Sequence, residues 1–277
     1  MPESPEILYF TVLLNKLITN KKIEKIIFNT DKPAIIPNDF EGIIKEIDCK
    51  GKLMWFVCSS NSNNKNYYLH IHFGITGWIE FIKPPKNIKY EIIINNNNNN
   101  NNNKIILYME DRRRFSKIAI YDEEKHKSII NKLGVSIFSE EFTEEYFNKI
   151  IKSRKTYVAS LIMEQNKIAG IGNYIKNEII YIGRLDARIK SNELSEEDIK
   201  KLYKNILFVA YSSLYEQLKQ MKIKKDFEDN YKRYNINKPE IIEVPYKFRI
   251  YGREKTEDNK KVKKIKVAGR DSYIVEE

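Results

Sequence analysis

The hydrophobic pattern of this chain changes its period near residue 122, and that change restricts the folds open to it. Residues 4–18 place apolar side chains at helical spacing, with Ser4 as N-cap and Pro5 in the first turn. From about Lys22 to Asp122 the chain alternates polar clusters with β-rich runs, namely IEKIIF, KLMWFVC, YYLHIHF, GWIEFI, KIILYM and KIAIYD. We predict a helix followed by a β-sandwich or barrel.

Beyond Asp122 the spacing of apolar residues is helical. Thr143 precedes one predicted helix, and Ser195 with Asp198 forms a capping box that opens a longer one, to about Met221. Residues 222–245 are charged and irregular, and the last 32 residues predict two strands around a polar turn. The nine asparagines of Asn95–Asn103 cannot fill a core, so we expect a surface loop there.

The composition favours an anionic partner. The 49 Lys and Arg against 38 Asp and Glu give a net charge of +11, which suits nucleic acid, although an indifferent basic surface would give the same charge. Cys49 and Cys58 are too few for a disulfide framework or a four-cysteine zinc site. No apolar run approaches the length of a membrane span, so we expect a soluble, intracellular protein.

Three stretches carry residues suited to binding. In LIMEQNKIAGIGNYIKNEIIYIGRL, two glycines precede Asn173 at a predicted helix start, where backbone N–H groups favour an anion such as phosphate. HFGITG (72–77) and DRRRF (111–115) interrupt strands with tight turns, and the second projects arginines beside a phenylalanine. GKLMWF (51–56) places Lys52 at the edge of an apolar strand. Taken singly, the glycine turn and the two turns at 72–77 and 111–115 are better explained as ordinary turns, and Lys52 is explained equally well as a surface lysine.

Together these motifs resemble one family. PESPE at the start, GK in the early β-region, HFGITG, DRRRF, QNKIAGIGNYIKNE and a final GRDSY follow the order of the formamidopyrimidine-DNA glycosylase and endonuclease VIII family of DNA glycosylases. The motifs extend from Pro2 to Tyr273, which is nearly the whole chain. Their shared order is specific where each motif alone is not.

The resemblance implies catalytic roles at the amino terminus. Once Met1 is removed, the secondary amine of Pro2 would attack C1′ of a damaged nucleoside and form an iminium. Glu3 would protonate the deoxyribose ring oxygen, which requires that it hold a proton. Lys52 would disfavour the charged form of the amine, and Glu6 would orient the site.

The resemblance also implies a set of DNA-binding residues. Ile75 matches the intercalating apolar position, while Arg113 and Phe115 match the residues that fill the space of an extruded base. Asn173 matches a phosphate-binding residue of the helix-two-turn-helix motif. Arg270 matches the arginine of the carboxy-terminal finger, which acts both in binding and at the catalytic site.

One departure concerns the finger. Most relatives build it around four cysteines and zinc, whereas residues 251–270 contain no cysteine and resemble the zincless finger of the endonuclease VIII-like branch. We expect apolar contacts of Phe248, Ile250, Ile265, Val267 and Tyr273 to stabilise it instead. This interpretation predicts no metal and no cofactor.

These features together predict an α+β fold. It would consist of an N-terminal helix plus a two-sheet β-sandwich, then a helical helix-two-turn-helix domain that ends in a zincless β-hairpin finger. The expected boundaries are 1–125, 126–235 and 236–277.

The expected function is base-excision repair by a bifunctional DNA glycosylase and abasic-site lyase. Oxidised pyrimidines and hydantoins would be removed through a Schiff base on Pro2, followed by β,δ-elimination. The partner would be damaged DNA, with duplex or single-stranded form left open, and the protein a monomer that does not bind membranes. The alternatives are a catalytically inactive damaged-DNA-binding relative and, with less support, an RNA-binding module.

Overall fold

The structure is a computed structural model that describes residues 2–29, 36, 40–60, 65–96, 104–220, 225 and 246–276. The chain divides into two compact units. The first contains Met1–Pro2 and Ile7–Lys132, and the second contains Glu3–Glu6 and Leu133–Glu277. Most of the asparagine run expected to form a surface loop and almost all of the irregular segment 222–245 lie outside the described residues. The predicted three-part division stays a prediction.

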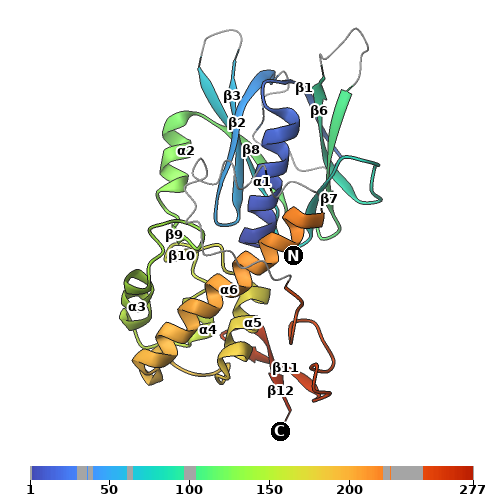
Figure 1. Ribbon diagram of the computed structural model, residues 1–277. Helices are drawn as coiled ribbons and strands as arrows, with labels where there is room; N and C mark the ends of the chain where they lie inside the picture. The colour runs from blue at the N-terminus through green and yellow to red at the C-terminus, as the bar shows by residue number, and fades with distance from the viewer. Residues whose placement is uncertain are drawn as a thin grey trace. The chain divides into compact units, whose positions relative to one another are not determined.

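The first unit contains most of helix α1 (Ser4–Ile18), which begins one residue before the start predicted at Pro5, together with an eight-stranded antiparallel sheet and helix α2 (Glu123–Ile130) (Figure 1). The strand order is β5-β7-β6-β1-β2-β3-β4-β8. The strands are β1 (Lys22–Phe28), β2 (Gly42–Lys50), β3 (Leu53–Ser59), β4 (Asn66–His72), β5 (Gly77–Glu80), β6 (Ile88–Asn95), β7 (Lys104–Asp111) and β8 (Lys117–Tyr121).

The strands pack face to face as predicted for a sandwich, but they form one continuous sheet and not two separate sheets. One small apolar gap is lined by β4 and β8 on one side and by β5, β6 and β7 on the other, so two halves of the sheet face each other. Two separate sheets were expected, but β1 pairs with both β6 and β2. Its pairing with β2 covers only Lys22↔Ile43 and Ile23↔Gly42. The halves are therefore one sheet, joined by a short corner.

Neither β6 nor β2 was among the six runs that the sequence singled out, and β2 illustrates the reason. Its register with β3 shifts between Ile44 and Glu46, where an irregularity interrupts the alternation of sides. Because strand prediction depends on a period of two, such a shift weakens the signal.

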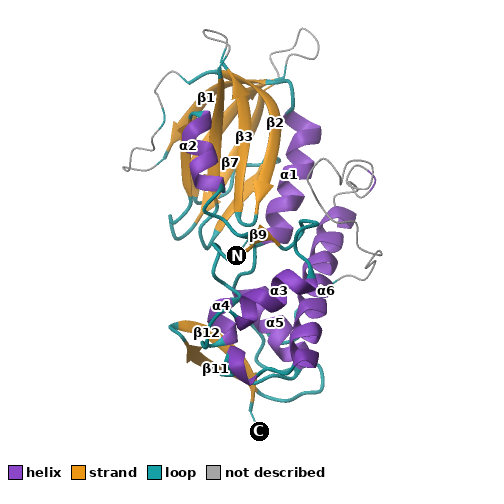
Figure 2. Ribbon diagram, turned by 90° about the vertical axis from the view of Figure 1, so that its left-hand side faces the viewer, coloured by secondary structure: helices purple, strands orange, loops and turns teal. Residues whose placement is uncertain are grey.

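Helices α1 and α2 pack on this sheet (Figure 2). The Asn15 side chain of α1 donates to the Ile47 carbonyl at 2.5 Å and accepts from the Ile47 N–H at 3.0 Å. On α2, His126 stacks on Tyr68 at a ring distance of 3.9 Å and lies 2.8 Å from a ring nitrogen of His70. Burial, and then the charge of His126, lower the pKa of His70 to about 4. Burial also lowers the pKa of His126, so at neutral pH the pair is a hydrogen bond between two uncharged rings.

The second unit is mainly helical, as expected. It contains β9 (Val135–Ser136), α3 (Glu144–Lys152), α4 (Val158–Leu161), β10 (Ile168–Ala169), α5 (Asn173–Gly183), the 3-10 helix η1 (Ser191–Glu193), α6 (Glu196–Gln220) and the hairpin β11 (Val262–Val267) with β12 (Arg270–Val275). Thr143 caps α3 by accepting from the Tyr146 N–H at 3.1 Å. Ser195 and Asp198 form the predicted capping box of α6 through two hydrogen bonds of 3.1 Å.

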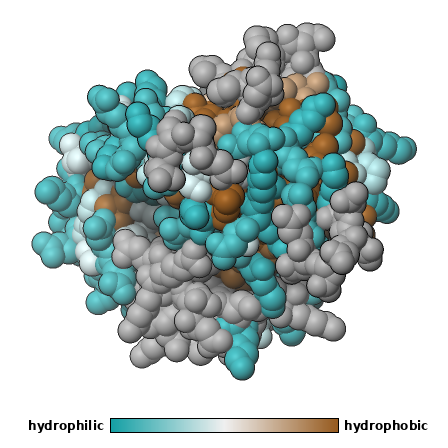
Figure 3. Space-filling view, turned by 90° about the horizontal axis from the view of Figure 1, so that it is seen from above, coloured by the Kyte–Doolittle hydropathy of each residue, from teal (hydrophilic) through white to brown (hydrophobic). Residues whose placement is uncertain are grey.

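Hydrophilic side chains dominate the coloured surface in Figure 3, with smaller hydrophobic areas between them. Among the helices that the structure describes, none combines the length and the apolar character needed to cross a membrane.

Candidate functional site

The amino terminus of α5 holds the carboxylate of Glu3. The N–H groups of Gly172, Tyr174 and Ile175 donate to Glu3 at 2.7, 2.8 and 3.3 Å, and the side chain is fully buried. The first N–H groups of a helix have no partner within the helix, and the helix dipole favours a negative charge there. The N-cap residue Gly172 has no side chain to accept them. Glu3 therefore completes the start of α5, and the helix in turn stabilises its ionised form.

This arrangement changes one expectation from the sequence. The glycine turn before Asn173 was predicted to let backbone amides approach an anion such as phosphate, and the anion found there is the protein's own carboxylate. Gly170 has a φ of +120°, and a Cβ at this position would lie 2.1 Å from the Ser4 hydroxyl oxygen. Glycine is thus required because the start of α1 lies directly against the turn.

Glu6 is the second carboxyl of this cluster, in a different environment. It accepts from the Glu3 N–H at 2.8 Å and from the Tyr174 hydroxyl at 3.2 Å. Burial raises the pKa of Glu6 to about 7, and the charge of Glu3 adds to this rise, while the Glu3 N–H opposes it. Burial also raises the pKa of Tyr174, which stays a donor. Near neutral pH the pair can therefore hold one proton, on Glu6, beside an ionised Glu3.

Asn173 and Arg270 lie on two elements of the second unit that are joined to each other. Asn173 is the first residue of α5, and its Oδ1 atom is buried without a hydrogen-bond partner in the part of the chain that the structure describes. Arg270 is exposed at the start of β12, next to a turn in which Ala268 and Gly269 have positive φ angles. Its charge contributes, after burial, to lowering the pKa of Lys176 on α5 to about 8.

Three consecutive polar residues of α5 hold the finger: Lys176 and Asn177 bind the hairpin, and Glu178 binds the segment before it. Lys176 donates to the Asp271 carbonyl at 2.7 Å and to the Ser272 hydroxyl at 3.0 Å. Asn177 accepts from the Tyr273 N–H at 2.9 Å. Both α5 side chains are almost completely buried.

Glu178 attaches the segment that leads into the hairpin. Its buried carboxylate accepts from the N–H groups of Arg249, Ile250 and Tyr251 at 2.8, 3.0 and 2.7 Å, and from the Tyr246 hydroxyl. A carboxylate that accepts from three consecutive N–H groups fixes the backbone of this segment.

Hydrogen bonds from α5 therefore hold the finger in addition to the apolar contacts expected from the sequence. Ile250 and Val267 are buried, but Phe248 is 41% exposed. Sequence reasoning missed Lys176, Asn177 and Glu178. The available signal was the occurrence of three polar residues in succession in a helix whose neighbours, Tyr174 to Ile180, are otherwise apolar.

The first unit brings HFGITG and DRRRF together. The Thr76 hydroxyl donates to Asp111 at 2.5 Å and accepts from the Arg113 N–H at 3.0 Å. A Cβ on Gly74, whose φ is +64°, would lie 2.7 Å from the backbone of Phe115. The two turns are thus side by side.

The residues predicted for base replacement are exposed on these turns. Ile75 is 38% and Phe115 49% exposed, and the Arg113 guanidinium lies 5.0 Å from the centre of the Phe115 ring. Both apolar side chains are thus accessible to a partner at these turns.

Two buried charged residues support these turns from within. Asp111 accepts from the Ser116 N–H at 2.6 Å. Burial alone would raise the pKa of Asp111, but hydrogen bonds from Thr76 and Ser116 outweigh it, so that the pKa is lowered. Lys89 donates to the carbonyls of Arg114 and Ser116 at 2.6 and 2.5 Å, where Arg114 has a φ of +56°. Lys89 was not identified from the sequence, since it occurs singly in a strand.

Pro2 and Lys52 also belong to the first unit. Pro2 is buried and directly precedes Glu3, the residue bound by α5. Lys52 is half-buried in the turn between β2 and β3, and its charge, after burial, contributes to lowering the pKa of His72. The structure thus groups Ile75, Arg113 and Phe115 in one unit and Glu3, Glu6, Asn173 and Arg270 in the other.

Comparison with known proteins follows the same two regions. The family model of the formamidopyrimidine-DNA glycosylase N-terminal domain matches residues 1–118, and that of the formamidopyrimidine-DNA glycosylase H2TH domain matches residues 133–224. A formamidopyrimidine-DNA glycosylase of Wolbachia sp. subsp. Brugia malayi is 25% identical over 73% of this chain and 74% of its own length. One from Ligilactobacillus salivarius is 28% identical over 75% of each chain.

Solved structures show the same fold. The MutM (Fpg) protein of Thermus thermophilus superposes with a TM-score of 0.75 at 20% identity, over 98% of this chain and 96% of its own. The Lactococcus lactis enzyme bound non-covalently to DNA containing an AP site gives a TM-score of 0.71 at 19% identity, over 99% and 98% of the two chains.

Proposed function

The chain belongs to the formamidopyrimidine-DNA glycosylase and endonuclease VIII family, and from this premise we propose that it is a base-excision-repair DNA glycosylase with abasic-site lyase activity. The observation that carries the proposal is the binding of Glu3 by three N–H groups of α5. Because Pro2 is covalently attached to Glu3, this anchor fixes the position of the amine that would act as nucleophile. A terminus without such an anchor would be expected to fray.

The chemistry begins at the amine of Pro2 after Met1 is removed. Its lone pair forms a bond to C1′ of the damaged nucleoside, and the bond from C1′ to the base breaks with its electron pair leaving on the base. The Pro2 nitrogen then loses its own proton to the departing base. Its lone pair forms the C=N bond of an iminium with C1′ as the bond from C1′ to the ring oxygen breaks, and the ring oxygen accepts a proton. A secondary amine cannot form a neutral imine, so the iminium persists and promotes β- and then δ-elimination of the flanking phosphates.

The two carboxyls divide the proton chemistry between them. Glu3 is the group nearest in sequence to Pro2 and is proposed to transfer the proton to the ring oxygen. In the free protein its three N–H donors favour the carboxylate, whereas the pKa of Glu6 is about 7. We assign to Glu6 the storage of the proton that this buried pair needs, beyond the orienting role expected from its position. Lys52 is proposed to disfavour protonation of the Pro2 amine.

The exposed turns of the first unit are proposed to stabilise extruded DNA. A base must leave the stack before its C1′ can be attacked, and that costs a few kcal/mol. Ile75 and Phe115 present apolar surface for the vacated space, and Arg113 presents a cation beside it. Asn173 and Arg270 are proposed to bind phosphate near the damaged nucleotide.

The carboxy-terminal finger is proposed to work without zinc. Its segment contains no cysteine, and no group of three potential ligands for a metal ion occurs within the described ranges. The donor set thus does not fit the zinc site of most relatives, and the buried hydrogen bonds from α5 supply an alternative attachment. This feature supports the endonuclease VIII-like branch, and with it oxidised pyrimidines and hydantoins as substrates. EDTA should leave DNA binding and cleavage intact, and loss of either would refute the metal-free finger.

The test is borohydride trapping on DNA with an abasic site. The protein lacking Met1 should form a covalent adduct, while a Pro2→Gly variant and a form that retains Met1 should form far less. A protein that binds the DNA tightly but gives no adduct would instead be a catalytically inactive relative.

A further inference from the structure

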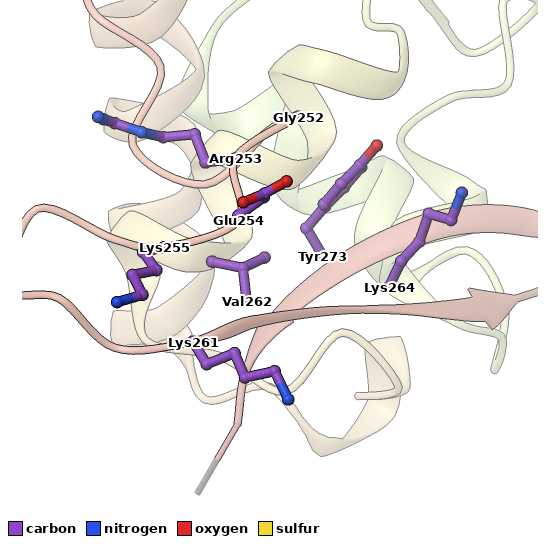
Figure 4. A pocket seen from close by; sticks show the side chains of 8 residues that line it. All are labelled: Gly252, Arg253, Glu254, Lys255, Lys261, Val262, Lys264 and Tyr273. Atoms are coloured by element: carbon purple, nitrogen blue, oxygen red, sulfur yellow. The ribbon is translucent and has the colours of Figure 1, made fainter.

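The finger carries a pocket that none of the roles above uses. It lies between the segment Gly252–Lys255 and one face of the hairpin (Figure 4). Its volume is about 480 Å³, within the ~300 to 1,000 Å³ typical of small-ligand sites. The lining residues are Gly252, Arg253, Glu254, Lys255, Lys261, Val262, Lys264 and Tyr273.

The walls of this pocket are held by hydrogen bonds of the backbone. The Val262 N–H donates to the Glu254 carbonyl at 2.8 Å, which joins the loop segment to β11. The Thr256 N–H donates to the Lys260 carbonyl at 2.9 Å and closes the loop between them. Tyr251 packs edge-on against Tyr273 at a ring distance of 5.3 Å. The pocket is therefore built into the fold of the finger.

The middle of the pocket is lined by aromatic and acidic side chains, and its rim by basic ones. In Figure 4 Val262, Tyr273 and the carboxylate of Glu254 gather at the centre, while the lysine side chains extend outward. Lys264 lies directly opposite Tyr273 in the register of the hairpin. Lys261 and Lys264 make ion pairs at 3.0 and 3.6 Å with Glu276 and Asp271, and exposed pairs of this kind are weak enough for a phosphate to compete with them.

We propose that this pocket binds one unpaired nucleotide of single-stranded DNA. The base would stack on Tyr273, its exocyclic amino group would donate to Glu254, and the adjoining phosphates would contact Lys255, Lys261 and Lys264. Aromatic side chains combined with a basic groove are the usual elements of single-strand binding. The proposal rests on the proposed function only in taking DNA as the partner.

This site is separate from the arginine at the hairpin turn. Tyr273 is three residues along β12 from Arg270, which corresponds to about 10 Å of extended strand. The finger would thus hold DNA at two places, with the pocket taking a strand that has left the duplex.

The carboxylate gives the pocket a base preference. Cytosine, adenine and guanine each carry an exocyclic amino group that a carboxylate can accept from, as Glu does from cytosine N4. Thymine carries no exocyclic amino group, and its single N3–H donor lies between two carbonyl oxygens, which a carboxylate repels. Oligo-dC should therefore bind more tightly than oligo-dT of the same length.

The experiment measures fluorescence anisotropy of short, undamaged oligo-dC and oligo-dT with the full chain. The wild-type protein should prefer oligo-dC by about fivefold. Glu254→Gln, on an exposed side chain, should bring this ratio close to one, because an amide can also donate to thymine. Lys264→Gln should weaken binding of both oligonucleotides by a similar factor. The matched control is Lys263→Gln, the adjacent exposed lysine that does not line the pocket, and it should stay within about twofold of the wild type.

Three results would overturn the proposal: equal affinity of the wild type for the two oligonucleotides, an unchanged ratio in Glu254→Gln, or equal losses in Lys263→Gln and Lys264→Gln. Competition by adenosine monophosphate at the concentration of the oligonucleotide would also overturn it, since the pocket would then serve a free nucleotide. These oligonucleotides contain no lesion or abasic site, so the outcome is independent of borohydride trapping, which tests the glycosylase activity.

Discussion

The two units position their candidate residues in opposite ways. In the first, the apolar side chains proposed to wedge into DNA, Ile75 and Phe115, are exposed, and the charged groups that support their turns, Asp111 and Lys89, are buried beneath. In the second, the carboxyl groups of Glu3, Glu6 and Glu178 are buried, and backbone N–H groups hold them. Both arrangements reverse the usual distribution of apolar and charged residues.

The contrast reflects the tasks proposed for each unit. A wedge has to present apolar surface to a partner, so its stiffness must come from elsewhere, here from hydrogen bonds to the buried Asp111. A proton-transfer group instead needs a shielded environment and a fixed orientation, which the start of α5 gives to Glu3. If this view is correct, substitutions at buried charges should affect stability, and substitutions at exposed apolar residues should affect binding.

The largest loss is expected for Glu178→Ala in the second unit. It leaves the buried Ile250 N–H, two partly buried N–H groups and the Tyr246 hydroxyl without their acceptor. At ~1 kcal/mol for each group, the lower end of the cost of an unsatisfied group because water reaches three of them, the loss should be about 4 kcal/mol. Hydrogen exchange should accelerate at the amides of Arg249, Ile250 and Tyr251. Glu178→Gln keeps one acceptor oxygen and should lose less. Unchanged exchange in Glu178→Ala would show that the finger is held by other contacts.

Glu6→Gln should remove a pH dependence of stability. Burial raises the pKa of Glu6 from 4.5 to about 7, so the folded protein retains a proton that the unfolded chain releases between these values. Unfolding then releases a proton, and this contribution lowers the free energy of unfolding as pH rises, by about 3 kcal/mol in total. Relative to the wild type, the variant should gain up to this amount between pH 4 and pH 8. Parallel denaturant titrations would check it, and a constant difference across that range would contradict it.

Asp111→Asn tests the support beneath the first unit's turns. The amide cannot accept at both former carboxylate oxygens, so a donor of Thr76 or Ser116 loses its partner, at a cost of about 2 kcal/mol. The neighbouring Glu110→Gln is a matched control, because Glu110 makes only a 4.0 Å contact with the exposed Arg112 among the ion pairs described. Thermal unfolding of the two variants should differ clearly. Equal melting temperatures would show that Asp111 does not stabilise these turns.

Phe115→Ala should have the smallest effect on stability. The ring is 49% exposed, so the free energy of unfolding should change by less than about 1 kcal/mol, whereas binding to DNA with an abasic site should weaken by ~1–3 kcal/mol if the ring stacks on a base. The buried Phe73 on the facing turn is the reference, where truncation should cost ~3–5 kcal/mol of stability. A large loss of stability without loss of binding would place Phe115 in the core and not in the wedge.

Much of this fold was predictable from periodicity and capping. The start of α1 within one residue of Pro5, the capped starts of α3 and α6 and the final hairpin all agree with the sequence. These features depend on local chemistry, which a sequence displays directly. The single sheet could not be foreseen, because it depends on a two-residue pairing between β1 and β2 that has no local signal.

The candidate site shows the same limit. Asp111 stands within the quoted DRRRF motif, yet its role depends on Thr76, which lies 35 residues earlier in the chain. Glu178 likewise depends on residues 68 to 73 positions away. Glu3 was expected as a proton donor from the family resemblance, and its binding by α5 was not expected, because the sequence predicted phosphate at that helix start. The sequence therefore does not predict the contacts between residues that are far apart in the chain.

The most direct test of the central claim is mass spectrometry of the borohydride-reduced complex with abasic DNA. After digestion with protease and nuclease, the cross-linked sugar fragment should be found on the amino-terminal peptide, attached to the nitrogen of Pro2. A cross-link located at Lys52 or at any other residue would contradict the account.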